Sequence, residues 1–273
     1  MTVSSRVSTA CFEKMVMRTA TGLGIIGTCI YFVLLFGVGN KSVYVAVLLI
    51  GLAISLPVAY ARKNELLETA CLLRNYADKH WMLMSFLLIL FTGYVIYGSS
   101  PIESYDTLTK HLPITLYAVE NGQWYTDITE SIVYGEPMVH QYTYSVLFVS
   151  VGANKALVLF NVVLLFSVYC ILCYFVRSIY ENASLSILAI IILTTPFFFQ
   201  FSTIFYLEML PLFFLFSAFV GVGKMETQNI WNNIEIISLI CGFSLFVKLT
   251  HVLTLVVMAM VLIISCVIIQ RSH

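Results

Sequence analysis

Long runs of apolar residues constrain the fold of this chain more than any other feature of its sequence. A helix needs about 20 consecutive apolar residues to cross the hydrocarbon core of a bilayer. Hydrophobic residues make up 60% of the 273-residue chain and charged residues only 10%. That composition leaves too little polar surface to cover a soluble domain. We therefore predict an all-α fold, a polytopic integral membrane helical bundle embedded in the lipid bilayer.

The apolar runs predict about eight transmembrane helices that form a single membrane domain, 1–273. The fifth and seventh runs are short, and only Lys248-Leu-Thr-His251 separates the last two, so a count from seven to nine stays open. The first run lacks a small-residue cleavage site, which favours a retained span over a signal peptide. The expected spans are 21–39, 43–61, 81–98, 156–176, 185–199, 205–222, 234–247 and 252–269.

The distribution of basic residues predicts the orientation. With eight spans and a cytoplasmic N-terminus, ten of the 14 Lys and Arg residues fall on the cytoplasmic side and four on the far side. This asymmetry obeys the positive-inside rule, under which short cytoplasmic loops carry the excess of Lys and Arg. We therefore expect both termini in the cytoplasm and the one long loop, 99–155, on the external face.

The long loop is acidic and contains a pattern typical of a helix. Between Ser99 and Tyr144 it holds six acidic residues against Lys110 alone. Leu108, Leu112, Leu116 and Val119 recur at helical spacing, which predicts an amphipathic helix at the outer membrane surface. Pro113 indicates a kink or a helix start at that point, and Asn121-Gly122 is a typical helix stop.

Three ionisable residues are the principal candidates for chemistry, and all three fall on the external side of the predicted topology. Asp106 follows the third span, where partial desolvation would suit a general base, although an Asp can equally cap a following helix. Glu208 has apolar neighbours on both sides, which marks a functional residue or a side chain that reaches to the interface. Lys248 could bind a phosphate or lipid headgroups.

Five further residues are candidates for substrate binding. Lys110 and His111 follow Asp106 closely, and His251 follows Lys248. Glu136 and His140 are four residues apart, a spacing that places two ligands on one helix face. No third ligand accompanies them, so we predict no metal site, although a divalent ion is compatible with the chemistry considered below. The net charge is zero, so we expect no nucleic-acid partner.

The stretch Asp106-Thr-Leu-Thr-Lys-His-Leu-Pro113, followed by Asn121-Gly122, resembles the Asp-x-x-x-Tyr-His-Leu-Pro…Asn-Gly stretch of the GT-C superfamily of membrane glycosyltransferases, in its protein-mannosyltransferase-like branch. Glu208 and the turn Lys248-Leu-Thr250 are further points of similarity. Two departures are that Lys110 stands where the family has Tyr, and that two apolar runs precede the loop, whereas in many relatives it follows the first span. The chain also ends at residue 273, whereas relatives are commonly longer, so we expect a divergent or truncated member.

The resemblance implies an inverting transferase of a bacterial inner membrane. Its donor would be a sugar on a polyprenyl phosphate, and its acceptor a hydroxyl group of a glycan, lipid or protein. Asp106 would serve as the base, Glu208 would orient the acceptor or support the base, and Lys248 would neutralise the leaving phosphate.

Two other functional classes fit a chain of this kind. A polysaccharide polymerase or transporter also has many spans and a large external loop, but this loop contains no Arg, and transporters place polar residues in broken helices at mid-bilayer. A non-catalytic or truncated membrane subunit is the other alternative, suggested by the short chain.

Overall fold

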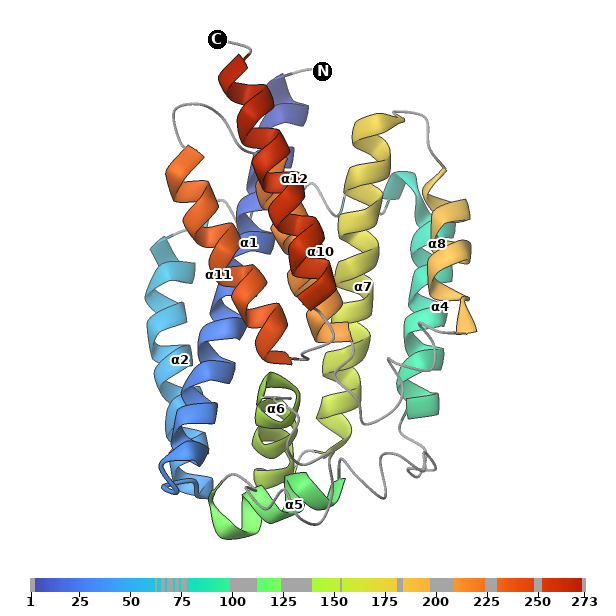
Figure 1. Cartoon of the computed structure of the whole chain (residues 1–273). Helices are drawn as coiled ribbons and strands as arrows, with labels where there is room; N and C mark the ends of the chain where they lie inside the picture. Colours follow the sequence, from blue (N-terminus) through green and yellow to red (C-terminus); the bar gives the residue numbers. More distant parts are fainter. Residues whose placement is uncertain are drawn as a thin grey trace.

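The described part of the chain is entirely helical (Figure 1). The structure is a computed structural model, and it describes residues 3–61, 63, 64, 67, 71, 74, 78–98, 112–123, 139–152, 154–180, 184–196, 209–223, 230–247 and 252–271. Within these residues the helices are α1 (Val3–Leu35), α2 (Lys41–Ala61), α4 (Trp81–Gly98), α5 (Leu112–Asn121), α6 (Val139–Ser150), α7 (Asn154–Ile179), α8 (Leu185–Leu193), α10 (Met209–Val222), α11 (Ile230–Val247) and α12 (Val252–Arg271).

Each predicted span overlaps one of these helices, and the described residues confirm the all-α fold class. Three described helices are long and apolar enough to cross a membrane, at Phe12–Leu35, Trp81–Gly98 and Ala156–Arg177. Shorter apolar helices occupy Lys41–Pro57, Met209–Val222 and Asn233–Ser244. Large apolar side chains also lie exposed on the outer faces of α2, α4 and α12, as expected where lipid rather than water surrounds a bundle. The described helices therefore indicate a membrane protein.

Several predicted boundaries differ from those of the helices, and two differ most. The first helix begins at Val3 rather than at residue 21, because Lys and Arg are good helix formers and do not interrupt it. The fifth helix ends at Leu193 rather than at residue 199. Pro196 has no N–H to donate and disfavours helical backbone in the residue before it, so α8 ends before this proline.

Local signals in the sequence account for the turn between α1 and α2. Gly37 adopts a left-handed conformation with φ of 65°, which costs glycine little. Its N–H donates to the carbonyl of Leu34, and the N–H of Val38 donates to that of Val33, the pattern of a Schellman motif. The side chain of Asn40 then accepts the N–H of Val43 at 3.0 Å and caps α2.

The helices run up and down the bundle, and its two ends differ. The start of α1 and the end of α12 lie at one end, together with the start of α4 and the end of α7 (Figure 1). Short helices α5 and α6 lie at the opposite end, close to the end of α1 and the start of α2. We call these the terminal end and the α5 end.

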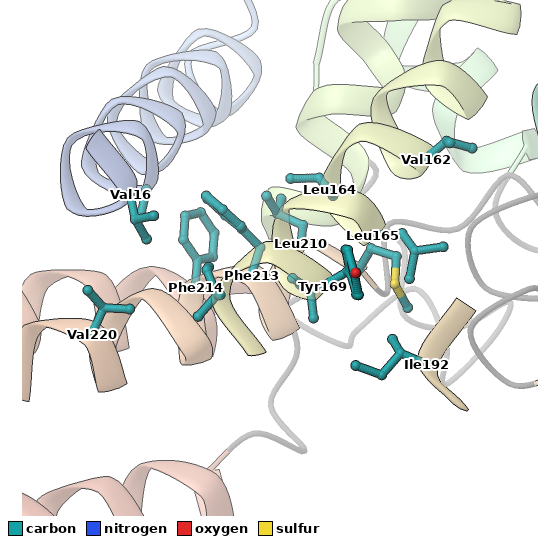
Figure 2. Close-up of a cluster of buried hydrophobic side chains, with 14 of the residues drawn as sticks. Val16, Val162, Leu164, Leu165, Tyr169, Ile192, Leu210, Phe213, Phe214 and Val220 are labelled. Carbon is teal, nitrogen blue, oxygen red and sulfur yellow. The ribbon is translucent and has the colours of Figure 1, made fainter. Parts of the chain in front are cut away.

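The main core lies where α10 packs against α1, α7 and α11. Phe213 and Phe214 project from α10 between Val16 of α1 and Leu164 of α7 (Figure 2), and all four are buried. Gly24 of α1 is in close contact with the ring of Phe243 on α11. Small residues permit this approach, as is usual for helices that pack inside a membrane.

A second, smaller core closes the α5 end and includes a helix that the sequence analysis did not predict. Helix α6 lies within the predicted external loop, yet it packs against α1, α5, α7 and α11. Its buried residues Tyr144, Val146 and Leu147 belong to the cores of the bundle. The polar residues Thr143 and Ser145 are also buried, and they lower the apolar character by which a core helix is recognised.

Candidate functional site

Seven of the eight predicted site residues lie outside the described residues. They are Asp106, Lys110, His111, Glu136, Glu208, Lys248 and His251. The eighth, His140, belongs to α6, which places its backbone in a helix, but its side chain is not among those described. The geometry of the candidate site is therefore built from the helix ends that flank these residues.

Four described helix ends adjoin the candidate residues directly in the chain. Helix α5 begins just after His111, α10 just after Glu208, and α12 just after His251, while α11 ends just before Lys248. The starts of α10 and α12 and the end of α11 all point toward the α5 end of the bundle (Figure 1). Helix ends far apart in sequence are thus directed toward one end of the molecule.

The start of α10 lies in the protein interior. Met209 and Leu210 are fully buried, and Pro211 occupies the first turn of the helix, where a missing N–H costs little. Ser217, one further turn into the core, satisfies its hydroxyl by donating to the carbonyl of Phe213 at 2.6 Å. Glu208 is therefore followed in the chain by two residues without contact to solvent.

Helix α5 has the boundaries that the sequence pattern indicates. It begins at Leu112, so Pro113 lies in the first turn, and it ends at Asn121. Gly122 follows with φ of 66°. These observations confirm that Asn121-Gly122 marks a helix stop, and they place Pro113 in the first described turn of α5.

The buried face of α5 differs from the predicted apolar stripe. Ile114, Thr115 and Ala118 are buried, whereas Leu116 of the stripe is exposed. Thr115 lies outside the predicted apolar stripe, yet it has no exposed surface. The small side chains of Thr115 and Ala118 allow close packing against the bundle, and the larger leucine is left on the outside, where lipid would contact it.

Two glycines attach α5 to the turn between α1 and α2. The N–H of Gly39 donates to the carbonyl of Gly122 at 2.8 Å. A Cβ atom on Gly122 would lie 1.9 Å from the carbonyl oxygen of Gly39, and one on Gly39 would lie 2.3 Å from the hydroxyl of Tyr44. No larger residue fits at either position, so the Asn-Gly pair serves both to end α5 and to anchor it.

Helix α6 is held in the bundle by a tyrosine. The hydroxyl of Tyr144 donates to the carbonyl of Leu23 on α1, and its ring stacks on Phe160 of α7 with centroids 5.2 Å apart. The backbone of His140 lies one helical turn before Tyr144. This places a predicted substrate-binding residue on a helix fixed to α1 and α7, rather than on a surface segment.

One buried polar pair escaped the sequence analysis, and it lies toward the terminal end. Glu13 of α1 is buried and accepts a hydrogen bond from the hydroxyl of Tyr174 on α7. The signal was present in the sequence, because Glu13 shares a helical stripe with the buried residues Val16 and Ala20. An acidic residue on the buried stripe of an apolar helix generally has a partner.

No metal cluster is formed by the residues described: they contain no group of three or more His, Cys, Asp or Glu side chains that could hold an ion. Comparison with known proteins adds no family to the geometry. No family model matches the chain, and neither a curated protein nor a solved structure is found to be similar to it.

Proposed function

We propose that this chain is a GT-C-type membrane glycosyltransferase of about eight spans, which transfers a sugar from a polyprenyl phosphate to an acceptor hydroxyl on the external face. The observation that carries the proposal is the common direction of the helix ends. The ends that adjoin Glu208, Lys248 and His251 all point toward the α5 end of the bundle, where α5, whose start adjoins His111, lies (Figure 1). A site assembled from Asp106, Glu208 and Lys248 requires this arrangement.

The proposed reaction is a single inverting displacement. The acceptor oxygen attacks the anomeric carbon, its proton passes to the carboxylate of Asp106, and the bond between the anomeric carbon and the phosphate oxygen breaks. The electron pair of that bond leaves with the polyprenyl phosphate, whose added charge Lys248 would neutralise. A fixed cation stabilises the transition state because it acts where charge develops.

The anchored position of α5 supports this proposal in a second way. Asp106 precedes α5 by only a few residues in the chain, and α5 is attached to the α1–α2 turn through Gly39 and Gly122. A catalytic base needs a fixed position relative to its substrate, because small displacements reduce the rate strongly. An anchored helix next to the base meets that need.

The decisive experiment compares two carboxylates of the same loop. The chain is reconstituted in liposomes with radiolabelled undecaprenyl-phosphate hexose and an extract of envelope glycans and lipids as acceptor. We expect Asp106→Asn to lower the rate of sugar transfer by about a hundredfold or more, since a general base typically contributes that much. Asp127→Asn removes the same charge from the same loop and should leave transfer unchanged.

Full transfer by Asp106→Asn would disprove the mechanism. Absence of transfer by the unaltered chain with every hexose donor tested would favour the alternative of a non-catalytic subunit. An experimental structure provides an independent check, because a separation of more than about 15 Å among Asp106, Glu208 and Lys248 would exclude a shared site for one substrate.

A further inference from the structure

An apolar pocket of about 400 Å³ lies between α1, α4, α7 and α10. Each of these helices contributes a phenyl ring to its lining, from Phe12, Phe91, Phe166 and Phe213 respectively. Ser167 also lines it, but its hydroxyl already donates to a backbone carbonyl of its own helix at 2.8 Å. The lining therefore favours a hydrocarbon ligand over a polar one.

The pocket opens to the outside of the bundle within the apolar zone. Met15 of α1 and Val163 of α7 both line it, and they are 48% and 46% exposed. Three of its four walls are the helices that are long and apolar enough to cross a membrane. The medium at its opening is then lipid hydrocarbon. A cavity with apolar walls does not hold water, and this volume lies in the range of ligand pockets, about 300–1,000 Å³.

Basic residues lie on α1 beside the opening of the pocket, and their long side chains can extend toward the terminal end. Lys14 and Arg18 are exposed on α1, adjacent in sequence to the lining residues Met15 and Thr19. They are four residues apart and so lie on one side of the helix. Arg177 is exposed near the end of α7, which lies at the same end of the bundle (Figure 1). Exposed cations next to a membrane attract anionic headgroups.

The neighbouring acid does not cancel this charge at the surface. Glu13 is buried, and its carboxylate accepts the hydroxyl of Tyr174. It is therefore directed into the α1–α7 contact, whereas Lys14 and Arg18 face outward. The ring of Tyr174 also lies 5.6 Å from that of Phe12, centroid to centroid, which fixes the phenyl ring at the margin of the pocket.

We propose that this pocket binds one acyl chain of an anionic phospholipid, with the phosphate headgroup at Lys14 and Arg18. The apolar walls supply the affinity for the acyl chain, and the two cations favour a negatively charged headgroup. The site faces the terminal end, opposite the α5 end where the proposed glycosyl transfer would occur, and it does not depend on that function.

Lipid binding to the purified protein tests the proposal. The chain is stripped of lipid in a mild detergent and titrated with dioleoyl phosphatidylglycerol or dioleoyl phosphatidylcholine, and bound lipid is counted by native mass spectrometry. We expect one tightly bound phosphatidylglycerol molecule per protein and markedly weaker binding of phosphatidylcholine. The double variant Lys14→Gln/Arg18→Gln should weaken the binding of phosphatidylglycerol about thirtyfold. Each basic residue near an anionic headgroup contributes roughly five- to sixfold to the affinity. The exposed residues Lys63 and Arg74, neither of which lines the pocket, provide the control Lys63→Gln/Arg74→Gln, which should have little effect.

A second variant tests separately whether the pocket binds the acyl chain. Ser167→Phe fills the pocket and should lower the bound phosphatidylglycerol about tenfold or more, whereas Leu159→Phe, on the same helix but outside the pocket, should not. Unchanged helicity by circular dichroism shows that the variant folds, and Val163→Trp replaces it if Ser167→Phe does not fold. Equal binding of the two lipids, or full binding by the filled variant, would overturn the proposal. Displacement of phosphatidylglycerol by an equimolar amount of undecaprenyl phosphate would also overturn it, in favour of a carrier lipid.

Discussion

Helices α4 and α10 are both apolar along almost their whole length, yet they have opposite roles in the fold. Helix α10 is buried on several sides by α1, α7 and α11, whereas the main contacts of α4 within the described residues are with α7 and α8. In α4 only Leu83 and Tyr94 are buried, while most residues of α10 are. The contrast shows that an apolar helix can face either lipid or other helices. Its sequence does not distinguish the two, which depend on the helices that pack around it.

The glycines of the two regions show the same contrast. A Cβ atom added to Gly93 of α4 would meet no atom within 4 Å. In the main core around α10, a Cβ atom on Gly24 of α1 would lie 2.0 Å from the ring of Phe243. That ring in turn packs on Phe214 of α10. Close helix contact in a membrane depends on such small residues, and α4 has no contact of this kind at Gly93.

Removing a central ring should have the largest effect. Phe214 is fully buried, and its ring lies 6.0 Å from that of Phe243. We expect Phe214→Ala to lower the free energy of unfolding by about 3 kcal/mol, because the cavity leaves its neighbours without packing contacts. Titration of the reconstituted protein from lipid micelles into dodecyl sulfate, followed by circular dichroism, measures the loss.

Ile89→Ala on α4 is the matched control for this prediction. Ile89 is 69% exposed, so its removal should change the free energy of unfolding by less than about 0.5 kcal/mol. Similar losses for Phe214→Ala and Ile89→Ala would mean that α4 is buried in the assembled protein, and the distinction between the two helices would not hold.

Adding a single methyl group should have the next largest effect, and its cost should differ between the two regions. Gly24→Ala brings a Cβ atom into the ring of Phe243, and we expect a loss of about 2 kcal/mol from overpacking. Gly93→Ala should be neutral or stabilising by about 0.5 kcal/mol, because alanine loses less backbone entropy than glycine. The same unfolding titration compares the two variants.

A double variant tests the cause of that loss. Phe243→Leu should recover part of the stability of Gly24→Ala, because the smaller side chain leaves room for the methyl group. If Phe243→Leu and Gly24→Ala instead have additive costs, the two residues do not interact, and the close α1–α11 contact is not the origin of the effect.

The sequence predicted the helices well where the signal is local. The span at 81–98 agrees with α4 at both ends, and Asn121-Gly122 marks the end of α5, with Pro113 in its first described turn. These signals work because proline and glycine act on their own backbone. The contact between Gly39 and Gly122 joins distant segments and has no local signal, so it could not be predicted.

Helix α6 and the candidate site show the limits of prediction in different ways. Thr143 and Ser145 give α6 the composition of a surface segment, although the fold buries both, because a polar group can be buried when it has hydrogen-bond partners. The placement of Asp106, Glu208 and Lys248 together depends on loops outside the described residues. Their proximity stays a prediction, supported by the helix ends that adjoin them.

The smallest effect is expected for a buried polar contact that attaches α4 to α8. The hydroxyl of Tyr94 donates to the carbonyl of Leu193, one of the last four carbonyls of α8, which lack helical partners. Hydrogen bonds between membrane helices contribute about 0.6 kcal/mol on average, so Tyr94→Phe should lose about that amount, against no loss for the exposed Tyr60→Phe. Deuterium uptake by peptides of α8 is the more sensitive measurement, because loss of this bond should increase exchange in α8 before the rest of the bundle. If uptake in α8 matches that of Tyr60→Phe, the contacts with α7, which include the hydrogen bond from the hydroxyl of Tyr169 to the carbonyl of Leu185, are sufficient to hold α8, and the bond from Tyr94 does not stabilise it.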